Sequence, residues 1–419
     1  MIAVIGTGIT GLSSAWILSR YFPVTLFEKH SVLGMAAFGT RFQAGNTDLE
    51  FDIPFRTVKK DYYPLIFDIY RSAGIRTRKV DYSFRVESDK ETVFGFRARS
   101  FIGSTLGLPT IDSFRNRKGI RIFKDLIRFY TNSRKDFQQE KEPVSILNFL
   151  KKNSYSSEFI YEFLLPTFAL VNTCRTETVG NYPAETIIGY HSRGYGYTPQ
   201  ETAEFGTPDI VKRLSNSVKN VRLGTEIRSI RLDGGRPVVE TDAGSEKFDH
   251  VIVTTQANQA EKVLDKSLSV EKNILSKFKY ESSDVILHRD RSYFSKKDVS
   301  LLFRIQKGTD KPEVTLDLSR IIPECSGTEI YQTWNPHTVP DQSFILKTAR
   351  FERPTVDLDT VKAVADLEKI QNDKGRRIWF GGSYSMFGIP LLEAGARAAL
   401  SVSSKISGKS EEEIKKDWN

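Results

Sequence analysis

The first 28 residues constrain the fold of this chain more than any other segment. The apolar run at residues 2–5 suits a buried parallel strand, and it leads directly into the glycine pattern Gly-Thr-Gly-Ile-Thr-Gly of residues 6–11. Residues 12–18 have the composition of a helix, and a second apolar strand at residues 24–27 ends in Glu28. This order is typical of the βαβ unit that binds a dinucleotide.

Each glycine of this unit, like Glu28, has its own physical role. Gly6 permits a tight turn out of the strand, Gly8 lets a pyrophosphate approach without meeting a Cβ, and Gly11 allows the helix to pack closely on the strand. The helix N-terminus offers free N–H groups and the positive end of its dipole to the phosphates. Glu28 is placed to accept hydrogen bonds from ribose hydroxyls, which argues against a 2′-phosphate as in NADP.

The residues that follow Glu28 bear on which dinucleotide is bound. Residues 30–34 form a turn with another glycine, Gly34, and no second glycine pattern of the first kind follows in the sequence. Two cofactors, NAD and FAD, fit the βαβ unit alone.

The sequence resembles the flavin-containing amine oxidase superfamily, and within it a group of predicted NAD/FAD-binding proteins related to phytoene desaturases. The similarity runs nearly end to end. Its segments are residues 28–34, 52–55, 63–64, 74–75, 81–84, 164–166, 182–184, 221–227, 248–255, 285–290, 334–336 and 379–383, with Gly388. The resemblance implies an FAD-dependent oxidoreductase that moves a hydride from a small organic substrate to the flavin. Amines, acyl lipids and isoprenoids are all open as substrates.

Two features depart from the superfamily pattern. Met35 replaces the second glycine of a Gly-Gly pair, which puts a side chain where the superfamily tolerates little bulk. Residues 384–392 are longer and less polar than usual, and they carry no cysteine for a covalent flavin bond. The expectation is therefore tight, non-covalent FAD.

The glycine pattern and the resemblance together predict the cofactor-binding residues. They are Gly6, Gly8, Ile9, Thr10, Gly11, Glu28, Lys29, Gly34, Met35, Ile227, Gly382, Ser383, Gly388 and Ile389. In the superfamily the residue at the position of Ile227 pairs with adenine through its backbone, so its side chain is expected only to pack. Pro390 is expected to open a helix over residues 391–406, with its N-terminus facing the flavin pyrimidine ring.

The predicted fold is α/β, with a Rossmann-type FAD-binding domain around a parallel sheet and an interleaved α+β substrate domain. The FAD-binding domain takes residues 1–56, 205–260 and 371–419, and the substrate domain takes residues 57–204 and 261–370. Helices are expected around 62–73, 145–151, 156–172 and from Gly206, and several strands after 280. Residues 221–230 and 238–253 read as a strand pair that rejoins the parallel sheet.

The sequence does not identify a catalytic base. His288, Tyr331, Trp334 and Tyr384 are candidates for lining the site, and for each the alternative is an ordinary packed residue. The two cysteines, Cys174 and Cys325, lack the spacing of a zinc or redox site, so we expect reduced, buried thiols in a cytoplasmic protein. Five scattered histidines predict no metal site.

The formal charge of +9 comes from Lys and Arg spread along the chain, and no nucleic-acid-binding motif accompanies it. No nucleic acid partner is therefore expected. Residues 115–130 stand apart because two stripes follow helical spacing there. The cationic stripe is Arg117, Arg121, Lys124 and Arg128, and the apolar stripe is Ile120, Phe123, Ile127 and Tyr130. Such a helix can lie on an anionic lipid surface or simply cover a core.

Two other classes of function stay open. One is a binding or escort protein on the same fold that has lost the flavin, similar to the Rab escort and GDP-dissociation-inhibitor proteins. Met35 favours this class, whereas the intact Gly6, Gly8, Gly11 and Glu28 oppose it. The other is an NAD-dependent dehydrogenase, which requires the C-terminal glycine segment to be a coincidence.

Overall fold

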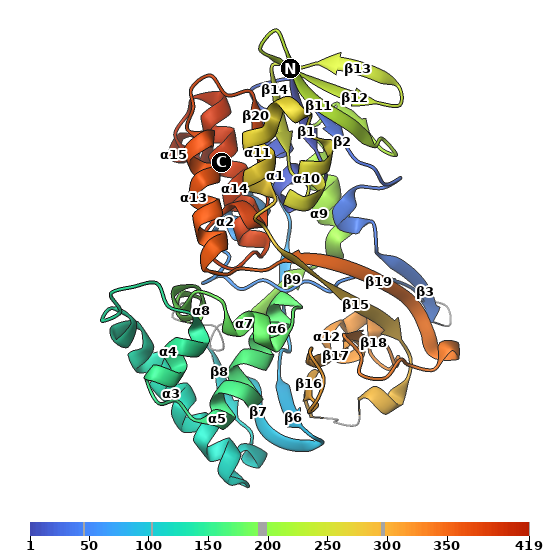
Figure 1. Cartoon of the computed structure of the whole chain (residues 1–419). Helices are drawn as coiled ribbons and strands as arrows, with labels where there is room; N and C mark the ends of the chain where they lie inside the picture. The colour runs from blue at the N-terminus through green and yellow to red at the C-terminus, as the bar shows by residue number, and fades with distance from the viewer. Residues whose placement is uncertain (45–46, 102–103, 192–198, 295–297, 419) are drawn as a thin grey trace.

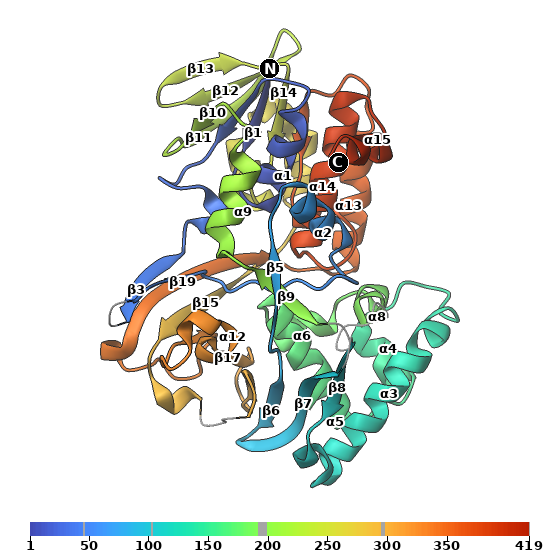
Figure 2. The same cartoon turned by 180° about the vertical axis from the view of Figure 1, so that it is seen from behind.

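The structure, a computed structural model, describes residues 1–44, 47–101, 104–191, 199–294 and 298–418. Two bodies lie one above the other and meet at a narrower waist (Figure 1). The upper body holds both chain ends, and the lower body combines a large sheet with a group of helices. Seen from behind, the short paired strands β5 (Thr77–Val80) and β9 (Gln200–Ala203) run along the connection between the bodies (Figure 2).

A parallel sheet of five strands forms the centre of the upper body. In spatial order its strands are β10 (Asn220–Arg222), β2 (Val24–Phe27), β1 (Ile2–Ile5), β14 (His250–Val253) and β20 (Ile378–Phe380). Strand β1 is buried throughout, as expected for a parallel strand covered on both faces. Its side chains alternate, so that Val4 joins one hydrophobic cluster and Ala3 the other.

Helices cover both faces of this sheet. Those of the first cluster are α1 (Ile9–Leu18), α2 (Pro64–Ser72), α9 (Gly206–Ser215), α14 (Leu392–Ser407) and α15 (Glu411–Lys416). Those of the second are α10 (Ala257–Val263), α11 (Ser269–Leu275) and α13 (Leu358–Gln371). Helix α2 is tied to α14, because the Glu393 carboxylate accepts from the N–H groups of Leu65 and Ile66, each at 3.1 Å.

The lower body is built on an eight-stranded sheet. In spatial order its strands are β19 (Ile345–Pro354), β15 (Tyr280–His288), β18 (Tyr331–Trp334), β17 (Glu313–Asp317), β16 (Leu301–Ile305), β6 (Phe84–Ser88), β7 (Glu91–Phe101) and β8 (Ser104–Pro109). Strands β16 and β6 run parallel, and the other neighbours are antiparallel. The long strands β15 and β19 extend to the waist (Figure 1).

The remaining elements are the long helix α3, several short helices and small sheets. The helices are α3 (Arg117–Phe137), α4 (Ile146–Lys152), α5 (Ser157–Phe159), a π-helical turn (Ile160–Leu164), α6 (Leu165–Asn172), α7 (Thr176–Gly180), α8 (Ala184–His191) and α12 (Leu318–Ile321). The strands are β3 (Thr40–Ala44) with β4 (Thr47–Phe51), and β11 (Ile227–Asp233) with β12 (Arg236–Thr241) and β13 (Gly244–Lys247).

This architecture confirms the predicted fold class, a Rossmann-type parallel sheet combined with an α+β body. The domain boundaries stay a proposal. The contacts of α2 with α14, and of α11 and α13 with the second cluster, favour placing these three helices in the upper body. Across the described ranges, each helix is too short or too polar to cross a bilayer.

Two local predictions were wrong. Residues 221–230 and 238–253 do not form a strand pair that rejoins the parallel sheet. Strands β10 and β14 join the parallel sheet, whereas β11, β12 and β13 form a separate antiparallel one, because the chain turns at Gly224, whose φ is +62°. Helix α14 has Leu391 as its N-cap, so Pro390 precedes the helix instead of opening it.

Candidate functional site

The glycine turn between β1 and α1 leaves room beside its middle glycine. Gly6 has φ +97°, which side-chain-bearing residues rarely adopt, and a Cβ on Gly11 would lie 1.9 Å from the Gly6 carbonyl oxygen. Gly8 differs from both: its φ is −69°, and no described atom lies within 4 Å of where its Cβ would be. A phosphate can therefore reach the backbone at Gly8 without displacing protein atoms.

Helix α1 points its N-terminus at the same space. Its first hydrogen bond runs from the Leu12 N–H to the Gly8 carbonyl at 3.0 Å, so the preceding amides have no partner within the helix. Together with the helix dipole, such amides favour an anion. Thr10 is buried, whereas Ile9 lines the cavity described below.

Glu28, at the end of β2, is buried and held by its neighbours. One carboxylate oxygen accepts from the Thr7 N–H (3.2 Å) and hydroxyl, and the other accepts from the His30 N–H at 2.9 Å. A carboxylate offers about four acceptor positions, so about one remains for a ligand hydroxyl. A Cβ on Gly34 would lie 2.8 Å from the first oxygen, which explains the glycine there, and Lys29 is exposed.

Met35 adds no bulk to this open space. Its side chain is buried in the first hydrophobic cluster. Its N–H donates to the Thr7 carbonyl at 3.2 Å, and its carbonyl accepts from Arg56 at 3.1 Å. The side chain of Met35 is therefore accommodated in the hydrophobic core and does not crowd the space beside Gly8. Ile227, the first residue of β11, likewise packs its side chain into the second cluster.

The C-terminal glycine segment lies against the start of α1. A Cβ on Gly381 would come within 3.1 Å of Thr10 Cγ2, and one on Gly395 within 2.6 Å of Ile9 Cγ2. Helix α14 thus packs closely on α1, with Gly382 and Ser383 just after β20. Gly388, at φ +122°, precedes the buried Ile389.

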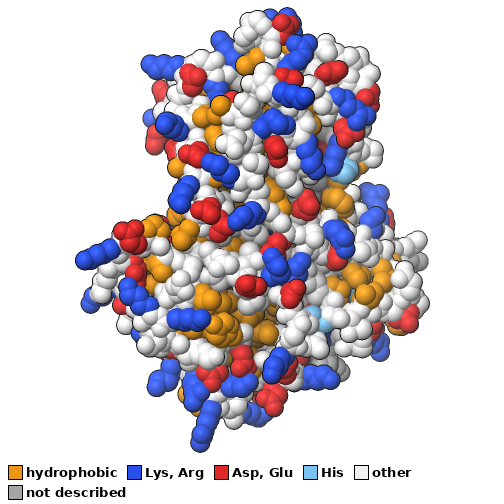
Figure 3. Space-filling view, viewed as in Figure 1, with side chains coloured by type: hydrophobic (Ala, Val, Ile, Leu, Met, Phe, Trp, Pro, Cys, Tyr) orange, Lys and Arg blue, Asp and Glu red, His pale blue; other side chains and the backbone are white. Residues whose placement is uncertain are grey.

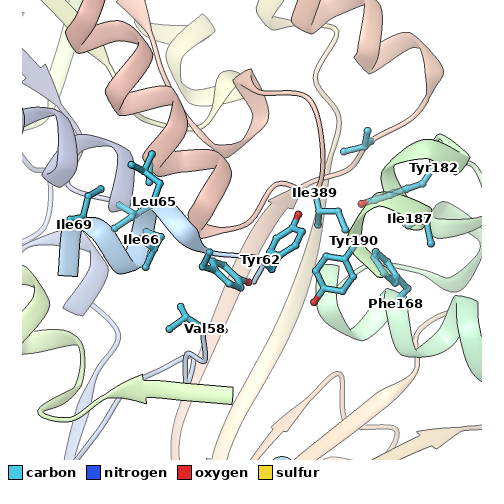
Figure 4. Close-up of a cluster of buried hydrophobic side chains, with 14 of the residues drawn as sticks. Val58, Tyr62, Leu65, Ile66, Ile69, Phe168, Tyr182, Ile187, Tyr190 and Ile389 are labelled. Atoms are coloured by element: carbon cyan, nitrogen blue, oxygen red, sulfur yellow. The ribbon is translucent and has the colours of Figure 1, made fainter. Parts of the chain in front are cut away.

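A cavity of about 290 Å³ lies where the two bodies meet. The upper body contributes Ile9, Ser383 and Leu391, and the lower body contributes Phe303 and Trp334 among others. An aromatic and aliphatic cluster adjoins it (Figure 4). There Tyr62, Ile389 and Tyr190 meet between α2 and the helices of the lower body, with the rings of Tyr62 and Tyr190 4.5 Å apart.

Two arginines that the sequence analysis did not single out also line this cavity, Arg56 and Arg353. Burial lowers the pKa of both guanidinium groups, and Arg56 further lowers that of Arg353, to about 10. At a pKa of about 10, Arg353 stays protonated at neutral pH. Arg353 lies on β19, and the sequence pattern of this strand carries no signal that separates it from the other surface cations.

Among the four predicted lining residues, only Trp334 borders the cavity. His288 is fully buried elsewhere in the sheet, with Nε2 2.8 Å from the Thr333 hydroxyl and Nδ1 accepting from the Asp290 N–H. Tyr331 packs on Phe294, and Tyr384 on Phe278. The rings of these three residues pack inside the protein, and the Tyr384 hydroxyl is buried without a hydrogen-bond partner among the described residues.

Comparison with known proteins agrees with this geometry. Residues 4–73 match the family model for an NAD(P)-binding Rossmann-like domain. None of the curated proteins matches the sequence.

Solved structures match the fold over nearly the whole chain. A protein assigned as a protoporphyrinogen oxidase from Exiguobacterium sp. 255-15 matches with a TM-score of 0.67 at 12% identity, covering 97% of this chain and 98% of that one. An oxidoreductase from Methanosarcina mazei matches with a TM-score of 0.66 at 14% identity, covering 96% and 99%. Wild-type putrescine oxidase bound to putrescine matches with a TM-score of 0.62 at 12% identity, covering 97% and 99%. At these identities the matches establish a shared fold.

Proposed function

We propose that this protein is an oxidoreductase that binds FAD without a covalent bond and oxidises a small organic substrate. One observation carries the proposal: a single cavity is bordered by the N-terminal residue of α1, by the C-terminal glycine segment and by the large sheet. The adenosine end of the cofactor would lie at Gly8 and Glu28, and the flavin ring would lie beside Ser383 and the start of α14.

The residues at each end fit such a cofactor. The open space at Gly8 and the unpaired amides of α1 suit a pyrophosphate, and the remaining acceptor position of Glu28 suits a ribose hydroxyl. The N-terminus of α14 favours negative charge on a ring placed there. Bound flavin supplies the acceptor for a hydride from a substrate C–H bond, and oxygen or a carrier then takes the electrons.

The protein's own part in that reaction is binding and the exclusion of water. The described lining residues are mainly aliphatic and aromatic, and they contain no His, Asp, Glu, Lys or Cys to act as a general base. This favours a hydride transfer that needs no protein base. Anaerobic mixing with amines, fatty acids and isoprenoids tests the proposal, since a substrate would bleach the bound flavin within a turnover. If FAD-loaded protein were bleached by none of the amines, fatty acids and isoprenoids, the proposed oxidation at this cavity would be wrong.

The two other classes of function account less well for the same contacts. An NAD-dependent dehydrogenase leaves the packing of Gly381 and Gly395 against Thr10 and Ile9 without a role. A flavin-free binding protein was favoured by Met35, whose side chain is buried in the core. The absence of bound flavin from purified protein would return both classes to consideration.

We also propose that α3 rests on an anionic lipid surface. The helix lies at the outer edge of the lower body (Figure 1), and its buried side chains include Ile122 and Phe129. Ile120 and Ile127 are 43% and 47% exposed, and Ile111 and Phe114 just before the helix are 76% and 46% exposed. Exposed apolar residues beside cations are what an interfacial helix requires.

Part of the predicted cationic stripe is engaged within the protein. Arg121 pairs with Glu158, and Arg128 donates to the Asn153 carbonyl while stacking on Tyr155. Elsewhere Lys and Arg mix with Asp and Glu over the molecular face instead of forming one basic patch (Figure 3). The apolar residues should therefore dominate, and the Ile120→Gln/Ile127→Gln variant should lose cosedimentation with anionic vesicles. Equal recovery of variant and wild type would contradict the lipid contact.

A further inference from the structure

The charged side chains that line the cavity are all positive among the described residues. Arg56 and Arg353 both line it, and its described lining residues include no Asp or Glu. The rest of the lining is largely apolar, with side chains such as Leu170, Phe303 and Trp334. The cavity is partly open, but its mainly apolar lining limits the water that can screen charges bound beside these two cations.

Arg56 is held by the protein itself. Its guanidinium donates to the carbonyls of Pro54 and Met35 and to the Thr207 hydroxyl, at 3.2, 3.1 and 2.9 Å. Asp52 lies close enough to favour its charged form. Arg56 therefore has a structural role that needs no ligand.

Arg353 lacks such an arrangement. Its guanidinium lies 5.5 Å from the centre of the Trp334 ring, and within the described residues it forms no ion pair or side-chain hydrogen bond. Glu281 lies directly opposite on β15, but its carboxylate accepts from Arg175 and Thr178. The neighbouring Glu352 carboxylate accepts from Asn258.

Arg353 is half-buried in this mainly apolar lining, where an anionic partner stabilises a guanidinium more than it would in open water. A ligand in the cavity can supply this partner, since the nearest carboxylates, Glu281 and Glu352, are engaged elsewhere. A guanidinium and a carboxylate can form two parallel hydrogen bonds, which fixes orientation as well as affinity.

We propose that Arg353 binds the carboxylate of the substrate, and that the substrate is an organic acid with an apolar body. This assignment rests on the proposed function and selects among its substrate classes. The same two guanidinium groups would repel a protonated amine, and an uncharged hydrocarbon would leave Arg353 unpaired. Arg353 would thus fix the orientation of the substrate by holding its carboxylate end.

Calorimetry on the protein as purified tests this with three six-carbon probes: hexanoate, hexylamine and 1-hexanol. Hexanoate should bind most tightly. Arg353→Gln should weaken hexanoate roughly 10- to 100-fold, the range for a lost charge-assisted hydrogen bond, and should leave 1-hexanol unchanged. Arg353→Lys should restore part of the affinity.

Arg350→Gln is the matched control. Arg350 lies on the same strand with a 70% exposed side chain, and it pairs with Asp284 away from the cavity, so hexanoate affinity should not change. Thermal unfolding of each variant separates loss of binding from loss of fold.

Three results would overturn the assignment. They are tighter binding of hexylamine than of hexanoate, no detectable binding of hexanoate, and unchanged hexanoate affinity in folded Arg353→Gln. If Arg353→Gln leaves hexanoate affinity unchanged but shifts the flavin midpoint potential, Arg353 pairs with the cofactor instead of the substrate. If hexanoate binding depends on Arg353 but the protein holds no FAD, the proposed oxidation fails while the anion site stands.

Discussion

The two ends of the proposed cofactor site are built differently. At the dinucleotide end, backbone geometry does most of the work: Gly6, Gly8 and Gly11 lie within one turn, and their roles follow from missing Cβ atoms. At the cavity end, side chains from distant segments converge, including Arg56 and Arg353. A site formed by the backbone of one turn can be recognised from a short sequence pattern. A site formed by side chains from distant segments cannot.

The sharpest test of this difference compares Gly8→Val with Gly11→Val. The first side chain enters open space at an ordinary φ, so the protein should fold but lose FAD binding. The second would collide with the Gly6 carbonyl at 1.9 Å, so it should lower the melting temperature strongly and lose FAD as well. Circular dichroism melts and FAD titration measure both. Two variants with equal stability would break the distinction between a ligand-facing and a packing glycine.

A second test asks where the cavity ends. Burial lowers the pKa of His288 to about 4 from an ordinary value of 6.5. Neutral His288 therefore contributes stability above pH 6.5, and this is lost as the pH falls from about 6.5 towards 4, because the unfolded chain takes up the proton first.

His288→Gln should accordingly flatten the pH dependence of the unfolding free energy over that window while leaving FAD affinity unchanged. Some dependence should persist, since burial also lowers the pKa of His250 to about 4. Urea unfolding at several pH values measures the slope. If the variant showed an unchanged slope, or bound FAD more weakly, His288 would belong to the cofactor site and not to the packed sheet.

The smallest expected effect concerns the start of α14. Asp and Asn are both good N-cap residues, so Leu391→Asp and Leu391→Asn should fold alike and differ in one charge. If the helix N-terminus faces the flavin, Asp should make its midpoint potential more negative than Asn does, by about 30 mV for a two-electron couple. Equal potentials would place that terminus elsewhere. Gly388 is a poorer position for the charge, because Asp would be strained at its φ of +122°.

Sequence alone predicted most of the fold and the dinucleotide end. Strands β1 and β2, the glycine turn and Glu28 occupy one continuous segment, where period and turn chemistry decide the outcome. The prediction for residues 221–230 was wrong because their apolar alternation continues across the turn at Gly224. Alternation alone does not show where a chain leaves one sheet and enters another.

The cavity could be predicted only in part. Trp334 was named together with His288, Tyr331 and Tyr384, but one strand sequence does not show which face of a sheet borders a cavity. Arg353 looks like a surface cation among many others in the sequence. Its significance depends on which carboxylates are already engaged, and only the assembled sheet, with Glu281 bound to Arg175, gives that information.

Identifying the cofactor of the purified wild-type protein tests FAD binding without any variant. The protein should show a flavin absorbance band at about 450 nm and release intact FAD on treatment with heat or acid. The amount released should be one FAD per chain. Colourless protein that also gives no heat when titrated with FAD would show that this chain does not bind the cofactor, whatever substrate the cavity accepts.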